Sequence, residues 1–118
     1  MTDETGPTSA IGSPVLAKIR SQVPEFEEPF QRELDAEGPE MGAFQGMSVF
    51  AGWLRARVEA SPAEPDVQRA FRVVEEVASS DDPMGHPMGR LLVTEFVEAL
   101  RDNPCAVALM GSETLRFG

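Results

Sequence analysis

The chain has little of the chemistry that small secreted proteins and many enzymes depend on. It contains one cysteine, Cys105, and one histidine, His86. A single cysteine excludes an internal disulfide and favours a reducing compartment. Nothing in the sequence brings the lone imidazole to the lone thiol, so a Cys-His catalytic pair is not supported. We expect His86 to lie in a loop and Cys105 to line the core.

Long apolar runs are also missing. No segment approaches the roughly 18 consecutive apolar residues that a membrane-spanning helix needs. Residues 1–12 have neither the basic start nor the apolar centre of a secretory signal. The sequence therefore predicts a cytoplasmic protein that does not enter a membrane.

Basic residues are few, and this shortage limits the possible partners. Ten Lys and Arg stand against twenty Asp and Glu, which gives a formal net charge of −10. Nucleic acid and anionic membranes attract basic surfaces, so neither is an expected partner. An acidic surface speeds the encounter with a basic protein, although the same charge also serves solubility alone.

Cofactor motifs are absent as well. There is no C-x-x-C pair and no glycine-rich loop followed by Lys-Ser or Lys-Thr. The segment 84–88 (MGHPM) offers two thioethers and an imidazole, ligands that suit Cu(I), but it occurs only once. Neighbouring carboxylates fall on predicted solvent faces rather than in a pocket. We expect a non-enzymatic protein with no catalytic residue, no metal and no cofactor.

What the chain does contain is helical periodicity. Its 118 residues, 42% of them hydrophobic, match one globular domain. We predict a disordered tail over residues 1–12 and a single helical domain over 13–118. Ser13-Pro14 is a typical helix start, and Gly38-Pro39 a typical helix end.

Apolar residues recur at spacings of three and four in each long segment, and no segment alternates with period two. The inward stripes are Leu16, Ile19 and Val23; Phe26, Phe30 and Leu34; Phe44, Met47, Ala51, Leu54 and Val58; Val67, Ala70, Phe71, Val74, Val77 and Ala78; and Leu92, Val93, Phe96, Val97 and Leu100. The pattern predicts an all-α fold, a compact bundle of about five short helices stacked as helical hairpins.

Candidate binding residues are surface residues. Acidic side chains gather in two clusters. One spans residues 25–40, with Glu25, Glu27 and Glu28 as its candidate binding residues; the other consists of Asp81, Asp82, Glu95, Glu98 and Asp102. The segment 43–59 has a second apolar side that includes Phe50 and Trp53. Aromatic side chains are frequent interface anchors, so this pair either contacts a partner or belongs to the core of the fold.

The order of these segments is distinctive. Val23-Pro24-Glu25-Phe26 precedes an acidic helix, and a Phe-bearing helix over 44–54 follows it. An amphipathic helix then ends in residues 79–82 (SSDD), and the segments 91–100 (LLVTEFVEAL) and 109–114 (LMGSET) come last. This order resembles a family of small helical bacterial proteins assigned as immunity proteins of polymorphic toxin systems.

The resemblance covers residues 15–115 and implies a protein that binds and blocks a toxin domain. The family has no catalytic residue to transfer, and the loop 83–89 departs from its pattern. The expected partner is a cognate protein toxin of basic character. The alternative is a small adaptor or regulatory protein that self-associates through Phe50 and Trp53. The sequence does not determine the oligomeric state.

Overall fold

The computed structural model describes residues 9–61, 63–79 and 88–116. Its helices are α1 (Pro14–Gln22), the short 3₁₀ helix η1 (Pro24–Phe26), α2 (Glu27–Glu37), α3 (Ala43–Ala60), α4 (Pro65–Ser79), α5 (Met88–Leu100), α6 (Pro104–Leu109) and α7 (Ser112–Leu115). Over these residues the only β pairing is an isolated bridge between Ser9 and Gly42. The all-α prediction is confirmed.

The helix boundaries follow local chemistry. The Ser13 hydroxyl accepts the Leu16 N–H at 3.2 Å, which caps α1 as predicted. Proline is found at the first position of α1, where its missing N–H costs nothing. Helix α2 ends at Gly38, whose φ of 93° is a conformation that residues with a Cβ rarely adopt.

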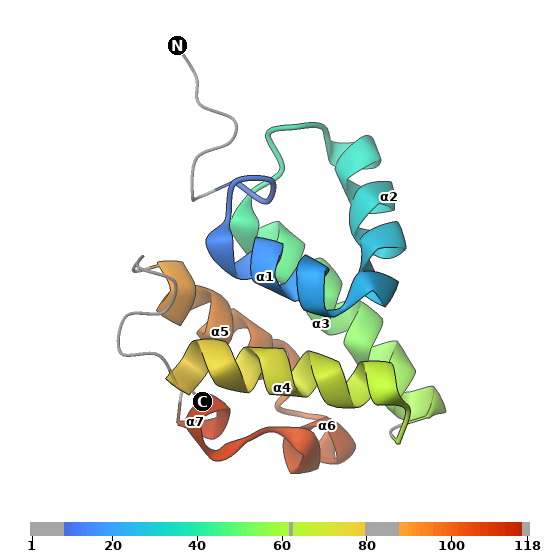
Figure 1. Cartoon of the computed structure of the whole chain (residues 1–118), viewed down its shortest axis with the longest axis vertical. Helices are drawn as coiled ribbons and strands as arrows, with labels where there is room; N and C mark the ends of the chain where they lie inside the picture. The colour runs from blue at the N-terminus through green and yellow to red at the C-terminus, as the bar shows by residue number, and fades with distance from the viewer. Residues whose placement is uncertain (1–8, 62, 80–87, 117–118) are drawn as a thin grey trace.

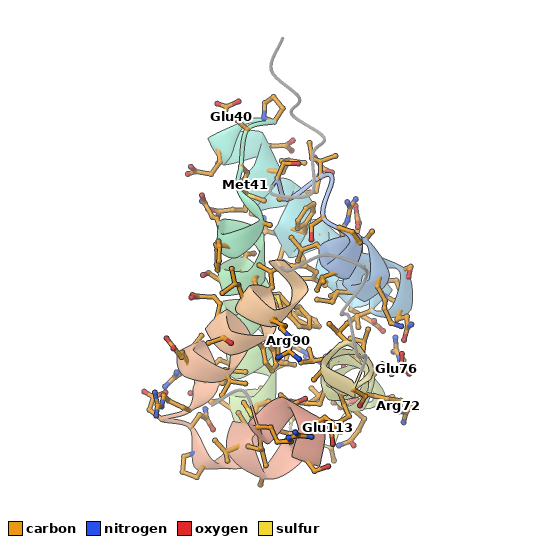
Figure 2. The ribbon with its side chains drawn as sticks, turned by 90° about the vertical axis from the view of Figure 1, so that its left-hand side faces the viewer. Glu40, Met41, Arg72, Glu76, Arg90 and Glu113 are labelled. Carbon is orange, nitrogen blue, oxygen red and sulfur yellow. The ribbon has the colours of Figure 1, made fainter. Side chains whose placement is uncertain are left out.

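The helices form two stacked hairpins. Helix α2 is antiparallel to α3, because Phe26 contacts Trp53 while Glu33 contacts Gln45. Helix α5 turns back on α4, and α3 lies beside α5 so that the two run in the same direction (Figure 1). Figure 2, turned by 90°, shows α1 and α4 on one side and α3 and α5 on the other. The outer sides of α3 and α5 therefore belong to one surface.

The predicted stripes form the core, with one exception. The apolar residues predicted inward on α4 and α5 are all buried, and Val73 joins them. On α3, Met47, Leu54 and Val58 are buried, but Phe44 is 43% exposed. The prediction that Phe44 faces inward is wrong because it lies in the first turn of α3, on the side next to α5.

The N-terminal boundary of the domain also needs correction. Ala10 is buried, and its N–H donates to the Met41 carbonyl at 2.8 Å. A Cβ added to Gly46 would lie 3.3 Å from the Ala10 Cβ, so the chain here lies tightly against α3. The prediction of a tail over residues 1–12 is wrong for its last four residues, while 1–8 fall outside the described ones.

Contacts between aromatic rings connect the two hairpins. The Phe50 ring on α3 lies 5.0 Å from Phe26 and 5.7 Å from Phe96 on α5, measured between ring centroids. Phe96 in turn meets Phe71 of α4 at 5.9 Å. Buried aromatic pairs add stability beyond the area that they bury. Phe96 is therefore the ring through which α5 joins both α3 and α4.

We expect Phe96→Ala to lower the free energy of unfolding by about 3–5 kcal/mol, because it leaves a cavity between three helices. Phe44→Ala is the matched control. Since Phe44 is exposed, its truncation should change the free energy by only about 0.5 kcal/mol. Urea unfolding of both variants measures the difference, and equal effects would contradict the helix phases described above.

Candidate functional site

The three candidate residues of the first acidic cluster are paired within the molecule. Glu25 pairs with Arg69, Glu27 with Arg20 and Glu28 with Arg32. The hydrogen bond from Arg69 holds the pKa of Glu25 below its ordinary value, and that from Arg20 does the same for the pKa of Glu27. An open depression of about 650 Å³ beside this cluster is lined by Arg32 as well as by carboxylates.

The second cluster divides. Asp81 and Asp82 lie outside the described residues. Asp102 pairs with Arg55 of α3 through two hydrogen bonds of 2.9 and 3.2 Å, which lower the pKa of Asp102. Glu95 accepts a hydrogen bond from a neutral group, the hydroxyl of Ser48, at 3.0 Å.

Glu98 completes this part of the cluster. It is exposed and has no hydrogen bond or ion pair with any residue that the structure describes. Glu95 and Glu98 therefore keep their negative charge uncompensated on the outer side of α5, unlike Glu25, Glu27 and Glu28.

The parallel arrangement of α3 and α5 brings two exposed apolar residues together. Ser48 meets Glu95 in the middle of the seam between the helices. Phe44 and Leu91 precede these two residues by one turn on their own helices, so the register places them side by side. Phe44 is 43% exposed and Leu91 50%. Large exposed apolar residues gathered in this way mark interaction sites more often than scattered ones do.

These residues define one surface, which we name the α3–α5 face. It consists of Phe44, Ser48, Gly52, Trp53, Arg55 and Ala56 on α3, of Leu91, Glu95 and Glu98 on α5, and of Asp102 in the turn after α5. It combines an apolar end, uncompensated carboxylates and, at the opposite end, the Arg55–Asp102 ion pair. Such a combination of apolar anchors and a polar rim is the usual anatomy of a protein interface.

The two aromatic candidates for partner contact, Phe50 and Trp53, differ in burial. Phe50 is fully buried, so the hypothesis that it contacts a partner is wrong; it is a core residue. Trp53 is half-buried, with its ring 5.8 Å from that of Phe26 and 6.1 Å from that of Phe50. Part of the indole therefore stays exposed on α3, beside the η1 residue Phe26.

Gly52 is the most open position of this face. A Cβ added there would meet no heavy atom within 4 Å. Ser48 and Ala56, one turn before and one turn after it, are also exposed. The outer side of α3 is therefore lined with small side chains over three turns.

Two buried or half-buried carboxylates were not among the predicted site residues. Asp66, 7% exposed, accepts two hydrogen bonds from Arg57 and one from the Val67 N–H. The Arg57 hydrogen bonds lower the pKa of Asp66 against the opposing effect of burial. Proline followed by an acid, at 65–66, is a typical helix start and was the available signal.

Glu75 is the second of these carboxylates. Its side chain extends from α4 and accepts hydrogen bonds from the N–H groups of Glu113 and Thr114 and from the Thr114 hydroxyl, at 2.9 to 3.1 Å. Burial raises the pKa of Glu75, but these three donors outweigh it and the net shift is downward. Figure 2 shows Glu113 close to the outer side of α4, where Arg72 and Glu76 lie. Glu75 is an anchor for α7.

No group of three or more His, Cys, Asp or Glu side chains in the described part of the chain is placed to hold a metal ion. No helix among the described residues has the length and apolar character needed to cross a membrane. Cys105 is exposed, so the expectation that it lines the core is wrong. In its six-residue helix, α6, Ala106 is the residue that faces the core. His86 lies outside the described residues.

Comparisons with protein-family models, with curated proteins and with solved structures found no match for this chain.

We expect acid to destabilise the protein through its hydrogen-bonded carboxylates. A carboxylate whose pKa is lowered by folding stabilises the native state above its unfolded pKa, and this stabilisation is lost as the pH falls through the folded pKa. Asp66→Asn should lower the free energy of unfolding by about 1–3 kcal/mol at pH 7. It should also lose less stability than wild type between pH 7 and pH 3.5. Urea titrations at both values test this; identical pH dependence would contradict it.

We also expect opposite effects from adding a methyl group at two glycines of α3. Gly52→Ala should raise the free energy of unfolding by about 0.5–1 kcal/mol, because alanine favours a helix and the added Cβ meets no atom. Gly46→Ala should lower it by about 1–3 kcal/mol, because its Cβ would lie 2.6 Å from the Leu16 Cδ1. Thermal or urea unfolding of the pair measures both signs.

Proposed function

We propose that this protein is an immunity protein. It binds a cognate toxin domain through the α3–α5 face and covers the toxin's active surface or the surface with which the toxin reaches its target. The resemblance of residues 15–115 to immunity proteins supports the biological role. The observation that supports the docking face is the exposed pair Phe44 and Leu91 beside the uncompensated carboxylates Glu95 and Glu98.

The apolar pair supplies the contact energy in this proposal. Burying a large apolar side chain that is half-exposed in the free protein removes its surface from water, at about 25 cal/mol per Å². A few such anchors carry most of the affinity of an interface, while the polar rim excludes water. Phe44, Leu91 and the exposed part of Trp53 are the anchors here.

The carboxylates select the partner. Glu95 is hydrogen-bonded only to a hydroxyl, and Glu98 has no partner among the described residues, so both present negative charge to an approaching protein. Opposite charge across an interface raises the association rate and disfavours wrong partners. The partner surface is therefore basic.

The first acidic cluster is a weaker docking site on the same grounds. Glu25, Glu27 and Glu28 each already accept a hydrogen bond from an arginine. A basic partner would have to displace these arginines, whereas Glu98 is available without any rearrangement. We therefore assign recognition to the face that carries Glu98.

The test is protection of cells from the toxin encoded beside this protein. Wild-type protein should rescue cells that express that toxin, and Glu98→Lys should lower the association rate by roughly tenfold at low salt. Because this substitution breaks no contact among the described residues, the fold should keep its stability. Rising salt should slow wild-type association through screening.

Glu76→Lys is the matched control. Glu76 lies on α4, on the opposite side of the molecule (Figure 2), and its exposed pair with Lys18 contributes little to stability. This variant should protect as wild type does. Wild-type protein that gives no protection would overturn the immunity role. A protein that instead associates with itself through Phe44 and Leu91 would support the adaptor alternative.

A further inference from the structure

We infer that the element of the partner that docks on this protein is an amphipathic helix with basic residues on both flanks, laid along α3. This inference rests on the proposed function and specifies what covers the α3–α5 face. It follows from three observations on the described residues: the row of exposed residues on the outer side of α3, the charges on either side of it and the chemistry at its two ends.

The outer side of α3 carries one row of exposed residues, three of them small. Phe44, Ser48, Gly52 and Ala56 follow one another at intervals of four residues and are all exposed. At about 1.5 Å per residue, the row is roughly 18 Å long, the length of a three-turn helix. Rows with this spacing form the ridges and grooves by which two helices pack. Side chains this small allow the axis of a second helix to approach closely at Gly52.

Negative charge borders the row on both sides. On the α2 side, Glu33 accepts a hydrogen bond from the Gln45 amide at 2.9 Å. On the α5 side, Glu95 accepts one from the Ser48 hydroxyl, and Glu98 follows one turn further along. Because the donors are neutral groups, the carboxylate charges are not cancelled. A helix lying on the row would meet Glu33 on one flank and Glu95 and Glu98 on the other.

The two ends of the row fix its polarity. The start is apolar, because the exposed Phe44 and Leu91 each precede the Ser48–Glu95 contact by one turn. The far end is closed by Arg55, which donates to the Ala99 carbonyl and to the Asp102 carboxylate. The docking helix therefore places its largest apolar side chain at the Phe44 end and a small or polar residue near Arg55.

These charges also disfavour the other possible occupants. A second copy of this chain would bring like-charged carboxylates together, since the whole chain carries a net charge of −10. An anionic membrane surface would be repelled by Glu33, Glu95 and Glu98 in the same way. A basic amphipathic helix satisfies both the apolar row and its acidic borders, in the manner of other helices that bind in grooves.

The molecule contains its own reporter for this test. Trp53 is the only tryptophan of the chain, and it is half-buried on α3, the helix that carries the row. The probe is a synthetic 16-residue peptide with leucines at helical spacing and lysines on both flanks. Titration into the full-length protein should change the Trp53 fluorescence. Two control peptides, one with glutamates for the lysines and one with the leucines scrambled, should each bind at least about tenfold more weakly.

Gly52→Phe is the decisive variant. A Cβ at this position meets nothing within 4 Å, so the variant should keep its unfolding midpoint while the ring occupies the row. It should weaken binding of the lysine peptide by at least about tenfold. Ala17→Phe, at an exposed position of α1, is the matched control and should bind as wild type does.

The outcomes separate this inference from the proposed function. Equal binding by Gly52→Phe and wild type, or by the leucine-scrambled and helical peptides, overturns the helix-docking inference. Where wild-type protein protects cells from the toxin and Gly52→Phe protects equally well, the immunity role stands and the docking mode falls. Where the peptide results hold but wild-type protein gives no protection, the docking mode stands and the toxin as partner falls.

Discussion

The contact between Phe50 of α3 and Phe96 of α5 is the constraint on which the arrangement of this protein depends, since it holds one helical hairpin against the other. Phe26 of η1 packs on the far side of Phe50, and Phe71 of α4 on the far side of Phe96. One row of rings thus passes through four helices. Because both central rings are fully buried, the two helices that carry them must lie side by side. Their outer sides consequently form one continuous surface.

The positions of the arginines then determine where negative charge remains unpaired on that surface. The chain has half as many basic as acidic residues, and most of the arginines on the described surface lie within an ion pair or hydrogen bond. These pairs join segments that are distant in sequence, as Arg69 does with Glu25 and Arg55 with Asp102. Among the carboxylates that no arginine pairs with are Glu33, Glu95 and Glu98, which lie beside the exposed row of α3. A sequence count of acidic residues does not reveal this difference.

Sequence periodicity predicted the fold well and the candidate site only in part. The stripes of α4 and α5 were correct because each helix has one apolar side, which has a single way to be buried. Helix α3 is apolar on two sides, so its sequence left the role of Phe50 open and placed Phe44 wrongly in the core. The register that pairs Ser48 with Glu95 arises from packing between distant segments, which local periodicity does not encode. The burial of Asp66 escaped prediction for the same reason.

The two apolar sides of α3 therefore have different physical origins. Phe50 faces the other hairpin and is covered by the chain itself, whereas Phe44 lies at the start of the helix and is exposed. Burying Phe44 would take a further segment over the first turn of α3, and the described residues place none there. The glycine at position 52 lowers helix propensity by about 1 kcal/mol without relieving any contact inside the molecule. Gly52 is therefore the position at which, in our proposal, the partner helix comes closest to α3.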